Sequence, residues 1–256
     1  MSINTNRPKP LRLIIGRNPV AEALSSGIAV EKIFLLRSAS GEDISTIKRL
    51  AAQLNIPLAQ VPQEKLDRFT RAQHQGVVAL AGLLQYIDLQ DGISHIVEGG
   101  STPLLIMLDG VTDVRNIGAI ARTAWCSGVQ GLILPTSHAA TLGEEAIKTS
   151  AGALNKIMLL RTPSAQQAID VLRLNGIQVL GTELRAGIPI HEADFAAPTC
   201  IVMGAEDKGI SKEVIKRADK LVHIPMATKF DSLNVSVATG MILYEAMRQR
   251  GIAAGR

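Results

Sequence analysis

The sequence has no apolar run long enough to cross a membrane. A helix that spans a bilayer needs roughly 20 consecutive apolar residues, and no stretch of the 256-residue chain approaches that length. The first ten residues are polar and lack the apolar core of a secretory signal peptide. We therefore expect a soluble protein without a membrane partner.

Cysteine and aromatic residues are scarce. The two cysteines, Cys126 and Cys200, lie within apolar segments, so we interpret them as reduced core thiols and expect a cytoplasmic location. Aromatic residues make up 3% of the chain, which argues against RNA-binding domains that stack bases on exposed rings. The five histidines lie far apart and show no ligand spacing with the cysteines, so we expect no metal site.

Sequence motifs of several common enzyme classes are also missing. No G-x-G-x-x-G follows an early strand, and no G-x-S-x-G marks a hydrolase nucleophile. The segment 204–209 resembles a phosphate loop only in part, because Lys208 precedes Gly209 instead of following it. Dinucleotide binding and nucleotide hydrolysis are therefore poorly supported.

Positive charge is concentrated in the first third of the chain. Residues 1–85 carry 11 Lys and Arg against 6 Asp and Glu, a net charge of +5, whereas residues 86–256 carry 16 against 17, a net charge of −1. A basic module ahead of a neutral one is typical of a part that meets an anion such as nucleic acid, although +5 over 85 residues is also ordinary surface charge. Both interpretations stay open on charge alone.

The pattern of apolar residues predicts two α/β domains. In residues 1–85, strands over 13–15, 32–36, 58–61 and 77–84 alternate with helices over 19–25, 43–54 and 63–69. Residues 86–102 are polar and glycine-rich, so we expect an interdomain linker with one helical turn near 93–97. In residues 103–256, fully apolar strands alternate with helices, which predicts a mainly parallel sheet covered on both faces, with ligands at the carboxyl ends of the strands.

Three junctions between a strand and a helix hold unusual polar residues. In the first, Asn116 is a natural N-cap. Arg122 of the same junction lies among small residues, one heptad after Arg115, so we expect Arg122 either to pair with a carboxylate or to bind a phosphate. In the second, Gly204 and Gly209 allow close approach to a ligand. The third is I-P-M at 224–226 followed by S-L-N at 232–234, ahead of a strongly apolar helix over 235–247. Such a helix must be buried on most sides, which suggests that a second subunit covers part of it.

Taken together, these junctions resemble the three motifs of the SpoU/TrmH family of RNA ribose methyltransferases. The motifs are NxGAxxRTA at 116–124, GAEDKG at 204–209, and IPM with SLNVSVATG at 224–240. They come in the family's order, and the basic front part is similar to the ribosomal-protein-like substrate-binding domain of a subgroup that methylates a guanosine in large-subunit ribosomal RNA. The resemblance implies a deep trefoil knot, S-adenosylmethionine as methyl donor, no metal, and a homodimer that acts on 23S ribosomal RNA.

The resemblance also assigns roles to individual residues. The residues implied in catalysis are Asn116, Arg122, Glu206, Ser232 and Asn234. Those implied in binding the methyl donor are Thr182, Glu183, Gly204, Gly209, Ile224, Pro225, Met226 and Leu233. From their charge and loop positions we add as RNA-binding candidates Arg12, Arg17, Arg71, His74 and Arg115. One departure is visible: family members often have a glycine where this chain has Thr228, and this affects the expected RNA substrate more than the reaction.

Two alternatives to this function follow from the same residues. One is a methyltransferase that acts on a guanosine ribose of transfer RNA. The other is a non-catalytic RNA-binding or ribosome-assembly protein, against which the intact Asn116, Arg122, Glu206 and Asn234 weigh.

Overall fold

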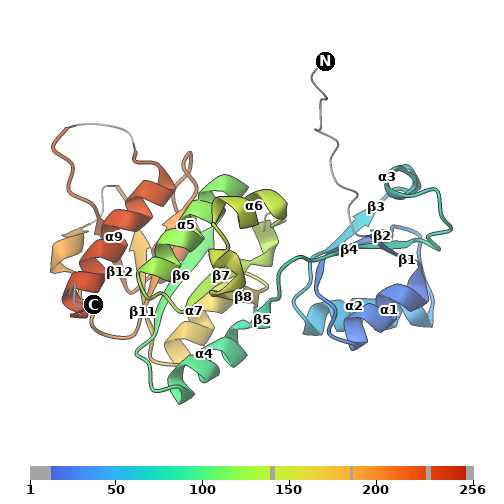
Figure 1. The fold of residues 1–256 in the computed structure, drawn as a ribbon, viewed down its shortest axis with the longest axis horizontal. Helices are drawn as coiled ribbons and strands as arrows, with labels where there is room; N and C mark the ends of the chain where they lie inside the picture. The colour runs from blue at the N-terminus through green and yellow to red at the C-terminus, as the bar shows by residue number, and fades with distance from the viewer. Residues whose placement is uncertain (1–12, 139–141, 185–186, 229–231, 252–256) are drawn as a thin grey trace. The chain divides into compact units, whose positions relative to one another are not determined.

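The computed structural model of the chain describes residues 13–138, 142–184, 187–228 and 232–251. Contacts between Cα atoms divide the chain into unit 1, residues 1–83, and unit 2, residues 84–256 (Figure 1). Among the described residues, no helix combines the length and the apolarity that crossing a membrane requires.

Unit 1 is a four-stranded sheet with helices on both faces. Its elements are β1 (Leu13–Ile15), α1 (Arg17–Ser25), β2 (Val30–Leu36), α2 (Glu42–Gln53), β3 (Leu58–Val61), α3 (Gln63–Phe69) and β4 (Val77–Ala81). The strand order is β1-β4-β2-β3, and only β2 and β3 run parallel. Side chains alternate along a strand, so Ile33 packs with α1 and α2 while Phe34 packs with Leu66 of α3. The seven predicted elements are confirmed within a few residues.

Unit 2 is built on an eight-stranded sheet with the order β10-β12-β9-β11-β6-β7-β8-β5, in which every pairing is parallel. Its strands are β5 (Ile87–Asp88), β6 (Leu104–Asp109), β7 (Gly131–Pro135), β8 (Met158–Thr162), β9 (Gln178–Thr182), β10 (Ile188–Pro189), β11 (Thr199–Gly204) and β12 (Lys220–His223). Its helices are α4 (Leu89–Glu98), α5 (Val114–Cys126), α6 (Glu144–Thr149), α7 (Ala165–Leu174), α8 (Lys212–Arg217) and α9 (Val235–Gln249), with short 3-10 helices η1 (Thr136–His138), η2 (Ala153–Asn155) and η3 (Ile190–Glu192).

Helices cover both faces of the sheet in unit 2, as the apolar strands predicted. Along β6, Ile106 packs in a cluster with residues of α5, α6 and α9, whereas Leu105 and Met107 pack with residues of α4, α7 and α8. The parallel α/β architecture is therefore confirmed. The trefoil knot stays a prediction from the resemblance.

Two expectations differ from the structure. Residues 86–102, which we expected to form a linker, contain β5, paired with β8, and the ten-residue helix α4, capped by Asp88, instead of one helical turn. Ile93 and Ile96 of α4 are buried in unit 2, so the polar residues we noticed lie on the outer side of an amphipathic helix. Cys200 is buried, but Cys126 is exposed at the end of α5, so the prediction of two core thiols is wrong for Cys126.

Candidate functional site

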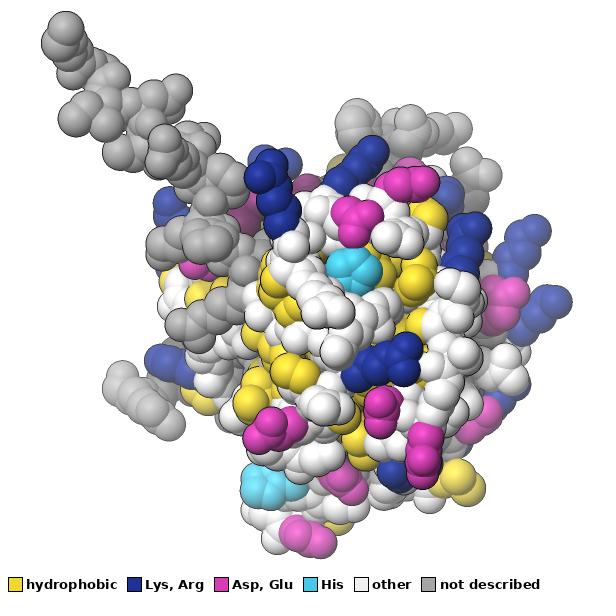
Figure 2. All heavy atoms as spheres, turned by 90° about the vertical axis from the view of Figure 1, so that its right-hand side faces the viewer, with side chains coloured by type: hydrophobic (Ala, Val, Ile, Leu, Met, Phe, Trp, Pro, Cys, Tyr) yellow, Lys and Arg dark blue, Asp and Glu magenta, His cyan; other side chains and the backbone are white. Residues whose placement is uncertain are grey.

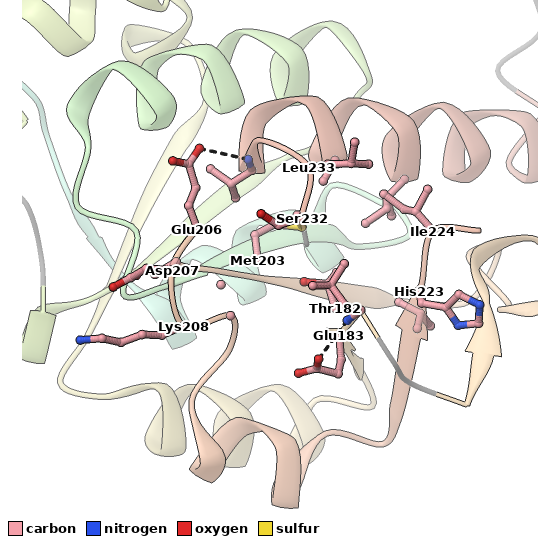
Figure 3. Close-up of a pocket in the computed structure, with 18 of the residues that line it drawn as sticks. Thr182, Glu183, Met203, Glu206, Asp207, Lys208, His223, Ile224, Ser232 and Leu233 are labelled. Atoms are coloured by element: carbon pink, nitrogen blue, oxygen red, sulfur yellow. Dashed lines mark hydrogen bonds between the residues drawn. The ribbon is translucent and has the colours of Figure 1, made fainter. Parts of the chain in front are cut away.

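A cavity of about 370 Å³ lies where β9, β11 and β12 end. Because parallel strands end at the same edge of a sheet, the loops after these strands meet there. Figure 3 shows side chains from all three loops around this cavity. The predicted donor-binding residues among its lining are Thr182, Glu183, Gly204, Gly209, Ile224, Met226 and Leu233. Pro225 is exposed and is not among the lining residues, although it lies between two of them.

The turn that follows β11 forms one wall of the cavity. Ala205 and Gly209 exchange two backbone hydrogen bonds, with N···O distances of 3.1 and 2.8 Å. Gly204 lies under this turn: a Cβ atom added there would meet the carbonyl carbon of Gly209 at 2.1 Å. Gly209 has a φ of +64°, which favours glycine. Both glycines of the second motif are therefore needed to close the turn.

A polar network at the rim of the cavity joins three distant parts of the chain. The side-chain amides of Asn116 and Asn234 both donate to Oε1 of Glu206, at 3.1 and 2.5 Å. The Asn234 amide also donates to Oδ1 of Asn116 at 3.2 Å, and the backbone N–H of Val235 donates to Glu206 Oε1 at 3.4 Å. The structure thus brings together three of the five residues implied in catalysis.

Asn116 is available for this network because another residue caps its helix. Asp113 is the N-cap of α5, and its carboxylate accepts from the backbone N–H of Arg115 at 2.8 Å. The hydrogen bond to this backbone N–H lowers the pKa of Asp113. Our prediction that Asn116 caps the helix is therefore wrong, because the helix begins one turn earlier. Its side chain is free to face Glu206.

Asn234 has two functions at the start of α9. The residues suited to cap α9 are Ser232 and Asn234, and the cap is Asn234: its Oδ1 atom accepts from the backbone N–H groups of Ser236 and Val237. Its Nδ2 atom remains on the other side to donate to Glu206. Ser232, two residues earlier, lines the cavity. The cap therefore orients the amide of Asn234 toward the network.

Arg122 is separate from this network in the single chain. It is exposed on α5, and no described carboxylate forms an ion pair with it. The structure therefore gives no support to the prediction that Arg122 pairs with a carboxylate. Arg115 is exposed as well, with Asp113 and Glu145 at 3.5 and 4.0 Å. Neither arginine lines the cavity.

Several residues that support the site carry no signal that our sequence reasoning recognised. Asp109, at the end of β6, is buried, and its Oδ2 atom accepts from the backbone N–H of Ser211 at 2.6 Å, which ties the turn after β11 to the neighbouring strand. Ala238 and Ile242 of α9 complete the apolar wall of the cavity. The register of β6 beside β11, in which Asp109 pairs with Gly204, places Asp109 at this turn.

Comparison with known proteins decides the family. Residues 103–244, more than half of the chain, match the SpoU rRNA Methylase family. The chain belongs to the SpoU family. Residues 13–87 also match the family described as RNA 2′-O ribose methyltransferase substrate binding.

Relatives of this SpoU chain match it over nearly its whole length. A putative TrmH family tRNA/rRNA methyltransferase of Staphylococcus saprophyticus is 34% identical over 93% of this chain and 96% of the relative. The crystal structure of the SpoU methyltransferase AviRb from Streptomyces viridochromogenes in complex with AdoMet superposes with a TM-score of 0.59, at 26% identity, over 94% of this chain and 91% of that one. An AdoMet-bound rRNA methyltransferase from Sinorhizobium meliloti gives 0.57, at 26% identity, over 92% and 86%. The chain is therefore an RNA methyltransferase of the SpoU/TrmH family.

The described RNA-binding candidates of unit 1 lie in or beside one loop of the SpoU chain, residues 70–76. His74 is half-buried: its Nδ1 atom accepts from the backbone N–H of Gly76 at 3.0 Å, and its Nε2 atom lies 2.9 Å from the Asp67 carboxylate. An accepting Nδ1 leaves the ring proton on Nε2, so the ring holds the loop together. Arg17 donates through Nε to the backbone carbonyl of Gln75 at 3.1 Å.

A hollow lies beside this loop, and Arg71 and Gln73 are among its exposed lining residues. Figure 2 shows Lys and Arg side chains spread over a face to which unit 1 contributes, with Asp and Glu side chains between them. Arg12 lies outside the described residues. The loop therefore brings together Arg17, Arg71 and His74, with His74 as an internal brace.

Proposed function

We propose that this SpoU methyltransferase transfers the methyl group of S-adenosylmethionine to the 2′-hydroxyl of a guanosine in 23S ribosomal RNA. The observation that carries the reaction is the network of Asn116, Glu206 and Asn234 at the rim of the cavity. It presents polar groups at the edge of a site for a small molecule. A hydroxyl group that enters there can be aligned without a metal ion.

The cavity fits the proposed methyl donor. Its volume of about 370 Å³ lies within the range of roughly 300–1,000 Å³ that small-molecule sites show. Ile224, Met226 and Leu233 offer apolar surface for a nucleoside ring, and the half-buried Thr182 and Glu183 offer polar groups. The carboxylates of Glu183 and Glu206 also favour a positively charged ligand.

In the proposed mechanism, the protein mainly orients the reacting groups. S-adenosylmethionine supplies an activated methyl group on a sulfonium centre. Asn116 and Asn234 orient the ribose, with Ser232 beside them on the wall of the cavity. Because a guanidinium group pairs well with a phosphate, we assign Arg122 to the phosphate of the target nucleotide.

We propose further that Arg122 acts in the site of a second subunit. Helix α9 exposes Val237, Met241 and Tyr244, of which Tyr244 is 71% exposed, on one side at helical spacing. Trp125 of α5, which packs against α9, is also exposed. An apolar face of this kind is typical of a contact between proteins. Arg122 lies one turn before Trp125, so a copy that covers this face would meet Arg122.

The choice of ribosomal RNA rests on unit 1. The rRNA methyltransferase from Sinorhizobium meliloti matches this chain over 92% of its length, which includes most of unit 1. The basic residues Arg17 and Arg71 beside the loop 70–76 are suited to the RNA backbone. A guanosine of transfer RNA is the second candidate, because the Staphylococcus relative is described as a tRNA/rRNA methyltransferase. The cytoplasmic location stays a prediction.

Methyl transfer by the purified protein tests this proposal. The protein is incubated with S-adenosylmethionine that carries a labelled methyl group, and with ribosomal or transfer RNA from a strain that lacks the protein. We expect labelled 2′-O-methylguanosine in 23S ribosomal RNA. Label only in transfer RNA would favour the second candidate, and label in neither RNA would contradict the proposed reaction.

A further inference from the structure

Methyl transfer to a ribose hydroxyl leaves one proton that must be accepted. As the bond between the 2′-oxygen and the methyl carbon forms, the bond between that carbon and sulfur breaks, and sulfur keeps the electron pair. The hydroxyl proton becomes strongly acidic during this step, so a carboxylate in hydrogen-bond contact suffices to take it. This inference rests on the proposed function and concerns the group that accepts this proton.

Few described residues near the network can accept a proton at neutral pH. Figure 3 shows the side chains of Asp207 and Lys208 pointing away from the cavity. The ring of His223 also points away from the cavity, and Glu183 lies across the cavity from Glu206. Glu183 moreover accepts through Oε1 from the backbone N–H of Leu184 at 3.0 Å. Glu206 is the carboxylate within the network itself.

The two oxygens of Glu206 have different surroundings. Oε1 accepts from the amides of Asn116 and Asn234 and from the backbone N–H of Val235. None of the described residues forms a hydrogen bond with Oε2. Figure 3 shows one carboxylate oxygen of Glu206 on a dashed hydrogen bond and the other directed away from that bond. Three donors on Oε1 fix the orientation of the carboxylate and leave the second oxygen free to accept.

We propose that Oε2 of Glu206 accepts the 2′-hydroxyl proton during methyl transfer. The network orients the carboxylate, and the substrate hydroxyl completes its hydrogen bonds. Oxygen gains the methyl group and loses its proton to Glu206, sulfur gains an electron pair, and the products are the methylated ribose, the thioether and a neutral carboxyl group. That carboxyl group returns its proton to water when the products leave, since Glu206 is exposed in the free protein.

The variant Glu206→Gln tests this role, because glutamine keeps an oxygen for the three donors but cannot accept a proton. We expect its single-turnover rate to fall by about 100-fold or more. We also expect its dissociation constant for S-adenosylmethionine, measured by calorimetry, and its melting temperature to stay close to those of the wild type. Glu213→Gln removes another exposed carboxylate, on α8, and should keep the wild-type rate.

A smaller fall in the rate of Glu206→Gln would show that Glu206 only positions the two asparagines, and would overturn the proposal. Should that variant fail to fold, Glu206→Ala offers a second test: formate should accelerate it, whereas formamide, which has the same shape but is a far weaker base, should not. Equal effects of the two compounds would also overturn the proposal. A wild-type protein that transfers no methyl group contradicts the proposed function instead, so the two failures are distinguishable.

Discussion

Replacing Gly204 by alanine is expected to open the turn after β11 and to damage the site. The added Cβ would lie 2.1 Å from the carbonyl carbon and 2.4 Å from the carbonyl oxygen of Gly209, and 2.2 Å from the backbone nitrogen of Ile210. All three atoms belong to the backbone and cannot turn aside as the end of a side chain can. The strands and the turn must therefore separate.

The expected loss of stability follows from the contacts that this separation breaks. Two hydrogen bonds join Ala205 and Gly209, and each contributes a net stabilisation of about 1 kcal/mol. Forcing a methyl group into a packed site costs about 1–3 kcal/mol in addition. The free energy of unfolding of Gly204→Ala should thus be lower by roughly 3–5 kcal/mol. Methyl transfer should fall as well, because Glu206 is carried on the same turn.

Fluorescence of Trp125, the one tryptophan of the chain, reports the urea unfolding of unit 2. Gly209→Ala is the matched control: its Cβ would meet only Glu183 Oε2, at 3.9 Å, so its cost comes from the positive φ and amounts to about 1–2 kcal/mol. Both variants are compared at one protein concentration. If Gly204→Ala lost no more stability than Gly209→Ala, the argument from backbone contact would be refuted.

Four further predictions concern other parts of the chain. Hydrogen bonds from Arg248 lower the pKa of Glu245 from 4.5 to about 2, so this carboxylate stabilises the fold fully above pH 4.5, and its contribution should be lost as the pH falls to about 2. The free energy of unfolding of Glu245→Gln should therefore fall less between pH 4.5 and pH 2 than that of the wild type, and an equal fall would contradict the role of Glu245. Arg122→Ala should lose methyl transfer by at least about 100-fold while calorimetry shows donor binding within threefold of the wild type; near-normal turnover would exclude the role. Light scattering at micromolar concentration should give roughly twice 27.3 kDa, and Tyr244→Glu should give a monomer; a wild-type monomer would rule out the homodimer. His74→Leu should weaken RNA binding about tenfold in fluorescence anisotropy, because two hydrogen bonds that hold the loop are lost, with donor affinity as the control; unchanged RNA affinity would mean that the brace does not serve binding.

The architecture was largely predictable from the sequence because its strands carry a strong signal. Runs such as 104–108 and 200–203 are apolar throughout, as strands buried on both faces must be. The length of the helix α4, of which we predicted only one turn near 93–97, was underestimated for the opposite reason. Its buried residues Ile93 and Ile96 lie among glycine and acidic residues that also suit a linker, and only packing in unit 2 distinguishes the two.

The candidate site was predictable as a set of residues but not as an arrangement. The motifs predicted Asn116, Glu206 and Asn234 together, and the structure joins them by hydrogen bonds. The sequence cannot show which acceptor caps a helix when Asp113 and Asn116 are both available, and the choice decides whether Asn116 is free. The approach of β11 to β6, through which Asp109 holds the turn, depends on strand order, which local patterns do not encode.

Mapping ribose methylation across the total RNA of a strain that lacks this protein tests the central claim most directly. We predict that one guanosine of 23S ribosomal RNA loses its 2′-O-methyl group in this strain. The wild-type protein should restore that methyl group, whereas the variant Arg122→Ala should not. RNA in which every ribose methylation persists without the protein would contradict the account.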